Sequence, residues 1–133
     1  LKPKKGRLKI DSVRVLQQRG WNQNVVDVDT YGSPWKHWQA LLPNAALPVT
    51  VFLTLGNTNL VALSPAATGS EIMRLPPHTP QALAAKISRE HSWRYWLASA
   101  SRHAKIVEAI EAIPSTEHSG ARYFGVRLSA LAK

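Results

Sequence analysis

The sequence predicts an α+β fold in which helices pack on one face of an antiparallel sheet. Residues 49–55 alternate in character, with apolar side chains at odd positions and Thr, Phe and Thr between them, as in a half-buried strand. Residues 80–113 start with a proline and then contain neither Gly nor Pro before Pro114, which is typical of helix. Together with flanking segments they predict the strand and helix order βαββαβ of a ferredoxin-like sandwich.

Length and composition predict a single domain. The chain has 133 residues, 44% of them hydrophobic, enough to bury a core. The absence of cysteine excludes a disulfide framework, a thiolate metal site and a cysteine nucleophile. We expect residues 1–7 to form a flexible basic arm or linker end and residues 8–133 to form one α+β domain. Because the chain begins at Leu1 without a signal pattern, we expect a processed product or an excised domain. The absence of cysteine is compatible with the cytosol or the periplasm, and we expect the cytoplasm.

Three elements are expected in the first third of the chain. Apolar residues between 8 and 15 predict a first strand, with a bulge near Asp11-Ser12 because the alternation slips there. The valines of 25–28 predict a short edge strand. Ser33-Pro34 is a typical helix start, and Pro43 prevents continuation, which predicts a two-turn helix over 34–42.

The rest of the chain predicts a hairpin, a long helix and a closing strand. Strand 49–55 is followed by Gly56-Asn57-Thr58-Asn59, which predicts a tight turn into a partner strand at 60–64. The helix over 80–113 is expected to bend near Glu90–Ser92. Tyr123 to Leu128 predicts the last strand, with Gly125 as a bulge.

Two tryptophan pairs at helical spacing predict a shared core. Trp35 and Trp38 lie three residues apart, as do Trp93 and Trp96, and both pairs have apolar neighbours at helical spacing. We therefore expect the two pairs to interleave in the core rather than to serve as ligand-stacking surfaces.

Positive charge is concentrated in two segments. Seventeen Lys and Arg oppose eight Asp and Glu, a formal net charge of +9. Residues 1–20 contribute 7 − 1 = +6 and residues 86–105 contribute 5 − 1 = +4, so the remainder sums to −1. Localised positive charge predicts a polyanionic partner, because each cation placed near a phosphate releases a condensed counterion.

These segments predict a nucleic-acid-binding domain that holds the phosphate backbone of DNA or RNA largely without sequence preference. The expected contacts are a basic arm and a basic helix face, namely Lys2, Lys4, Lys5, Arg7 and Lys9 with Arg94, Arg102 and Lys105. Aromatic residues in polar or open-face positions are candidates for base stacking: Trp21, Tyr31 and Phe52. A single footprint requires both basic patches on one surface. The arm is also compatible with a solubilising linker or with contact to anionic lipid.

Two other functions remain open at this point. One is a protein-interaction or assembly module, with protein partners or further copies of the chain, in a membrane-associated or secretion complex; it predicts an exposed apolar patch or a long unpaired sheet edge. The other is a small basic nuclease or toxin, which predicts a cleft that gathers a histidine with Glu or Lys. No sequence motif identifies catalytic residues or a cofactor. Asp27 and Asp29 could share a metal ion, but a third carboxylate at ligand spacing is lacking, so no metal site is predicted.

Overall fold

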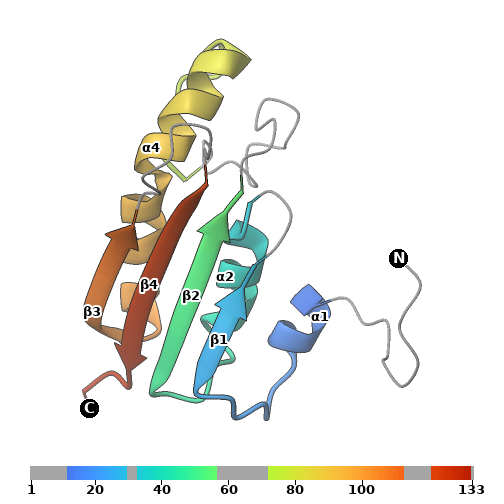
Figure 1. The fold of residues 1–133 in the computed structure, drawn as a ribbon, viewed down its shortest axis with the longest axis vertical. Coiled ribbons are helices and arrows are strands. Elements are labelled where there is room, and N and C mark those ends of the chain that lie inside the picture. Colours follow the sequence, from blue (N-terminus) through green and yellow to red (C-terminus); the bar gives the residue numbers. More distant parts are fainter. Residues whose placement is uncertain (1–11, 30–32, 57–71, 113–120, 133) are drawn as a thin grey trace.

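The protein has an α+β architecture (Figure 1). The computed structural model describes residues 12–29, 33–56, 72–112 and 121–132. In chain order its elements are α1 (Ser12–Gln17), β1 (Val25–Val28), α2 (Trp35–Leu41), β2 (Val49–Leu55), α4 (Gln81–Ser99), the 3-10 turn η2 (Ala100–Arg102), β3 (Lys105–Ala112) and β4 (Arg122–Ser129).

The described strands form one mixed sheet in the order β1-β2-β4-β3. β1 runs parallel to β2, whereas β4 is antiparallel to both β2 and β3. The prediction of a wholly antiparallel sheet is therefore wrong at β1. Two adjacent parallel strands need a crossover segment, and α2 lies in the segment that connects β1 to β2.

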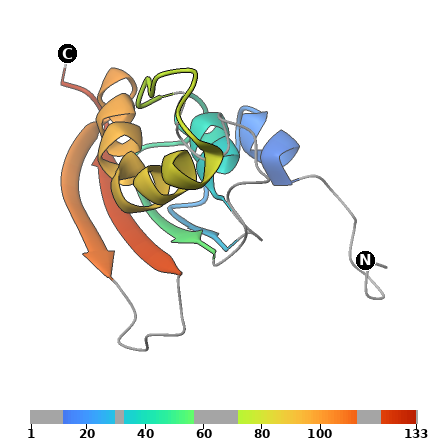
Figure 2. The same ribbon diagram turned by 90° about the horizontal axis from the view of Figure 1, so that it is seen from above.

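Helices cover one face of this sheet and leave the other face open, as predicted (Figure 2). β2 shows the reason, since Val49, Val51, Leu53 and Leu55 are buried beneath the helices while Phe52 on the other face is exposed. We call the side that carries α1, α2, α4 and η2 the helical layer and the opposite side of the sheet the open face.

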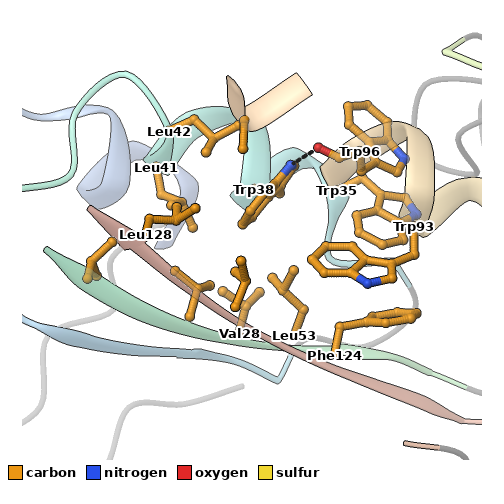
Figure 3. Packing of buried hydrophobic residues seen from close by; sticks show 14 of the residues in the cluster. Val28, Trp35, Trp38, Leu41, Leu42, Leu53, Trp93, Trp96, Phe124 and Leu128 are labelled. Atoms are coloured by element: carbon orange, nitrogen blue, oxygen red, sulfur yellow. Dashed lines mark hydrogen bonds between the residues drawn. The ribbon is translucent and has the colours of Figure 1, made fainter. Parts of the chain in front are cut away.

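The two tryptophan pairs meet in the core between sheet and helical layer, which confirms that prediction (Figure 3). The ring of Trp35 stacks on Trp93 and Trp96 with centroid separations of 6.0 and 5.6 Å. Phe124 of β4 closes the cluster from the sheet side, 4.7 Å from Trp93. These four aromatic rings pack α2 and α4 against the centre of the sheet, and aromatic pairs of this kind stabilise beyond the area they bury.

The predicted first strand over 8–15 is wrong within the described residues, because Ser12–Gln17 is helical. In α1, Leu16 is partly buried and packs against the core, and the Ser12 hydroxyl lies 2.7 Å from His37 Nε2 of α2. A bulge was expected near Asp11-Ser12. Ser12 instead begins a helix, and Asp11 lies outside the described residues. The first strand of the sheet is instead 25–28, as its valines predict.

The predicted hairpin is also not the observed pairing of β2. Its expected partner, 60–64, lies outside the described residues, and β2 has β1 on one side and β4 on the other. In β4, Leu128 pairs with Val49 and Arg122 with Leu55, so the antiparallel partner comes from the last quarter of the sequence.

The helix predicted over 80–113 ends early. α4 is continuous from Gln81 to Ser99, without the expected bend near Glu90–Ser92, and the chain turns at η2 into strand β3. Ile106, Ala109 and Ile110 have helical spacing, and it is pairing with β4 that makes residues 105–112 a strand. After α1, the order strand, helix, strand, helix, strand, strand replaces βαββαβ, and the ferredoxin-like order is not found. The irregularity in the last hairpin lies in β3 between Ile106 and Glu108, not at Gly125.

Candidate nucleic-acid interface

The helical layer and the sheet differ in charge. α1, α2, α4 and η2 contain six Lys and Arg and one acidic residue, giving 6 − 1 = +5. The four strands contain three basic and three acidic residues, so their charges cancel. The six cations of the helical layer are Arg14, Lys36, Lys86, Arg89, Arg94 and Arg102, and its one acid is Glu90.

Acidic side chains neutralise arginines of the sheet rather than those of the helices. Within the described residues, the two arginine–carboxylate ion pairs both join β4 to β3: Arg122 Nη1 lies 3.0 Å from Glu111 Oε1, and Arg127 Nη1 lies 3.9 Å from Glu108 Oε2. The cations of the helical layer, apart from half-buried Arg89, are exposed to solvent. Exposed cations that form no ion pair with a described carboxylate are available to an external anion.

The three predicted helix-face residues do not all lie on a helix. Arg94 is on α4 and Arg102 is in η2, whereas Lys105 is the first residue of β3. All three are exposed. Arg102 and Lys105 remain near one another because only two residues separate them, but the turn after η2 removes Lys105 from the face that carries Arg94.

The basic arm, with Lys2, Lys4, Lys5, Arg7 and Lys9, lies outside the described residues. The first described element is α1, which packs beside α2 and next to the β1 edge (Figure 1). Lys105 is in β3, the strand at the other edge of the sheet. The structure therefore brings Arg94 and Arg102 into one layer but places Lys105 and the start of α1 at opposite edges.

Arg89 is a feature of this layer that the sequence did not single out. It is half-buried on α4, its Nη1 lies 3.5 Å from the carbonyl oxygen of Gly56, and its Nη2 is buried without a hydrogen-bond partner among the described residues. Burial and, next, the positive charge of Arg122 lower the pKa of Arg89. Only membership of the basic 86–105 segment pointed to this residue in the sequence.

The predicted stacking residues have different surroundings. Trp21 is half-buried against the core, and its indole N–H donates a 3.1 Å hydrogen bond to the carbonyl of Leu16. Tyr31 lies outside the described residues. Phe52 is 44% exposed on the open face. Tyr123, which was not among the predicted residues, is 45% exposed on the same face and pairs with Thr54, two residues from Phe52 on β2.

The open face contains a shallow hollow at Gly125. A Cβ atom at this position would lie 3.0 Å from Cγ1 of Ile110 and 3.3 Å from the ring of Phe52, so glycine lets these two side chains approach closely over the strand. Glu108 and Arg127 are its charged neighbours. None of the described histidines lines it, so the hollow lacks the histidine that the nuclease hypothesis requires of its cleft.

Phe52 and the basic residues of the helical layer face opposite sides of the sheet, so one footprint does not contain both. The strand register places Asp27 and Glu108 on the open face together with Lys105 and Arg127, so two anions and two cations cancel there. Phosphates are therefore favoured at the helical layer and not at the open face.

Neither a metal centre nor a membrane-spanning helix is found in the part of the chain that the structure describes. Its residues include no group of three or more His, Cys, Asp or Glu placed to hold a metal ion. Its helices include none with the length and apolar character needed to cross a bilayer. Comparisons of the chain with family models, with curated proteins and with solved structures give no match.

Proposed function

We propose that this protein binds nucleic acid by its phosphate backbone, with the helical layer as the contact surface. The observation that carries the proposal is the segregation of charge: +5 on the helical elements against 0 on the strands. Each exposed cation that neutralises a phosphate releases a counterion, which is the main source of affinity in non-specific binding.

The geometry favours backbone contacts over base reading. Arg94 and Arg102 are exposed, and no hydrogen bond to another described residue holds either guanidinium group in a fixed orientation. Sequence reading needs side chains fixed against base edges, as in bidentate Arg–guanine pairs. Arg89 is held at 3.5 Å from the Gly56 carbonyl and its other terminal nitrogen is buried. The exposed Arg94 and Arg102 are therefore the better candidates for phosphate contacts.

A salt titration tests the proposal. Fluorescence anisotropy with labelled single-stranded and duplex DNA and RNA gives the slope of log Kobs against log salt concentration for each probe. We expect Arg94→Ala and Arg102→Ala each to reduce the magnitude of the slope by about 0.7–0.9 for every phosphate that the arginine neutralises in the wild-type complex. The matched control is Arg127→Ala, since Arg127 is 59% exposed but belongs to the open face.

The titration has three distinguishable outcomes. Equal slopes for Arg127→Ala and wild type, with smaller slopes for the helical-layer variants, support the proposal. Absence of binding at low salt, or an equal reduction for Arg127→Ala, contradicts it. Shortened probes on a gel would favour the nuclease function instead. Replacing Lys2, Lys4 and Lys5 by Ala measures the contribution of the arm separately.

The assembly-module function is the second candidate, because exposed apolar side chains and a long sheet edge, either of which it predicts, support it. The open face exposes Val25, Phe52, Ile110 and Tyr123, and β3 has a long edge. Monomeric proteins normally cover or charge such an edge. This surface does not overlap the helical layer, so both functions can coexist in one chain.

A further inference from the structure

β3 forms a long, exposed edge of the sheet. It has eight residues, pairs with β4 on one side and with no other described strand, and is exposed at every position except Ile106. Ile106 packs against the core, but side chains beyond it are exposed on both faces of the strand: Val107 is 53% exposed and Ile110 is 56% exposed. Such an edge offers a row of backbone N–H and C=O groups to another strand.

The other edge of the sheet is different. β1 has only four residues, it contains Asp27 with Asp29 just beyond its end, and both aspartates are exposed. Short length and charge are two ways in which natural sheets prevent edge-to-edge pairing. β3 is twice as long as β1. It carries three charged side chains and an irregularity between Ile106 and Glu108, but residues 108–112 remain in regular register with β4 and include the apolar Ile110.

An apolar row crosses the open face and ends at this edge. Phe52 pairs with Gly125 of β4, and Gly125 pairs with Ile110 of β3. Because Gly125 has no side chain, Ile110 and Phe52 both approach the same point, and Ile110 remains more than half exposed. The row would be buried further if another apolar side chain were placed beside Ile110.

We propose that a second copy of this chain pairs with the β3 edge in antiparallel orientation, with Ile110 opposite Ile110 at the two-fold axis. In this register Glu108 faces Ala112 and Ala109 faces Glu111, so no like charges meet. A register centred on Glu108 would place two glutamates opposite each other, which is destabilising. Charge therefore disfavours the register centred on Glu108, and the apolar row favours the one centred on Ile110.

The charge distribution of the chain permits this contact despite its net charge of +9. The strands carry no net charge, and the excess of cations among the described elements lies on the helical elements rather than on β3. An antiparallel edge contact has its two-fold axis perpendicular to the sheet, so both helical layers lie on the same side of one continuous sheet. If the proposed function holds, the dimer presents two basic layers to one polyanion; the pairing itself does not depend on that function.

Sedimentation equilibrium across micromolar to high micromolar protein concentration, without nucleic acid, tests the pairing. We expect wild type to dimerise and Ile110→Lys to remain monomeric, because the substitution places two charges at the axis. Val25→Lys is the matched control, since Val25 is also 56% exposed on an edge strand and the open face. Far-UV circular dichroism of each variant checks that the fold is retained.

A cysteine variant tests the register. The chain has no cysteine, so Ile110→Cys introduces a single thiol. Opposed residues of an antiparallel pair have Cβ atoms about 4.5–5.5 Å apart, near the separation that a disulfide requires. Oxidation is expected to crosslink Ile110→Cys into a dimer and to leave Val25→Cys largely uncrosslinked.

The proposal is overturned if wild type is monomeric at the highest concentration, if Ile110→Lys dimerises like wild type, or if both cysteine variants crosslink equally. Capture of a different protein by an otherwise monomeric chain would also overturn it. None of these outcomes bears on the salt titration, so this inference and the proposed function fail separately.

Discussion

The indole N–H of Trp38 donates a 2.9 Å hydrogen bond to the backbone carbonyl of Trp96, joining α2 to α4 across 58 positions of sequence (Figure 3). Both residues are buried, and Trp35 stacks on Trp96 beside them. The hydrogen bond fixes how the two helices lie against each other, and hence how the cations of α2 and α4 are arranged in one layer.

Trp38→Phe is expected to lower the free energy of unfolding by about 2 kcal/mol. The substitution removes the hydrogen bond, worth about 1 kcal/mol, and leaves unfilled volume in a closely packed core. The Trp96 carbonyl keeps the Ser99 hydroxyl as a donor, which limits the destabilisation. Urea denaturation gives the value. Tyr95→Phe, at an exposed aromatic of α4, should change stability by no more than about 0.5 kcal/mol, and an equal effect of the two variants would contradict this account.

Ser92→Ala is expected to preserve or increase stability, by up to about 1 kcal/mol. Ser92 is completely buried on α4 and its hydroxyl has no hydrogen-bond partner among the described residues, so the substitution removes an unsatisfied polar group and raises helix propensity. Thermal unfolding measures the change. In the control Ser101→Ala, an exposed hydroxyl that donates to the Ala98 carbonyl is removed, and no gain is expected. Marked destabilisation by Ser92→Ala would show that the hydroxyl has a partner in solution.

The Glu111–Arg122 pair is expected to show a coupling energy of about 0.5–1 kcal/mol in a double-mutant cycle with alanine. Its atoms are 3.0 Å apart, and Arg122 has only 20% of its side chain exposed. The Glu108–Arg127 pair is the internal control, since it is 3.9 Å long and both side chains are well exposed. Its coupling should be close to zero and should vanish with added salt. The opposite ranking would refute this interpretation of the hairpin.

Arg89→Met is expected not to reduce the free energy of unfolding. Burial and the charge of Arg122 lower the pKa of Arg89, which means that the folded protein disfavours the charged guanidinium. Met keeps the apolar stem and removes the charge. We expect the same substitution to weaken binding to labelled DNA or RNA if the guanidinium holds a phosphate. Arg94→Met is the exposed comparison for stability, and a decrease above about 1 kcal/mol for Arg89→Met alone would indicate a structural role.

Some elements could be predicted because their signals are local. Alternation in 49–55 and the Ser33-Pro34 start mark β2 and α2, and both lie within a residue or so of the predicted bounds. The spacing of the four core tryptophans predicts their burial, and it is confirmed. The exposure of Phe52 follows from the same alternation.

Other elements could not be predicted, because they depend on contacts that are distant in sequence. Residues 105–112 include apolar side chains at helical spacing, and pairing with β4 selects the strand. The parallel pairing of β1 with β2 requires α2 as a crossover, which no residue of β1 signals. Tyr123 and Arg89 were missed for the same reason, since exposure on an open face and partial burial are properties of packing.

The sequence by itself determined the chemistry available to this protein: its excess of cations, its tryptophan core and the alternating strand at its centre. The physical reason is that side-chain periodicity and charge are properties of neighbouring residues. Only the tertiary structure decided that cations collect on the helical layer while the strands are neutral, and that β3 forms an uncovered edge. Both properties depend on which strands, distant in sequence, pair in the sheet. That pairing depends on the burial and hydrogen bonding of the whole sheet.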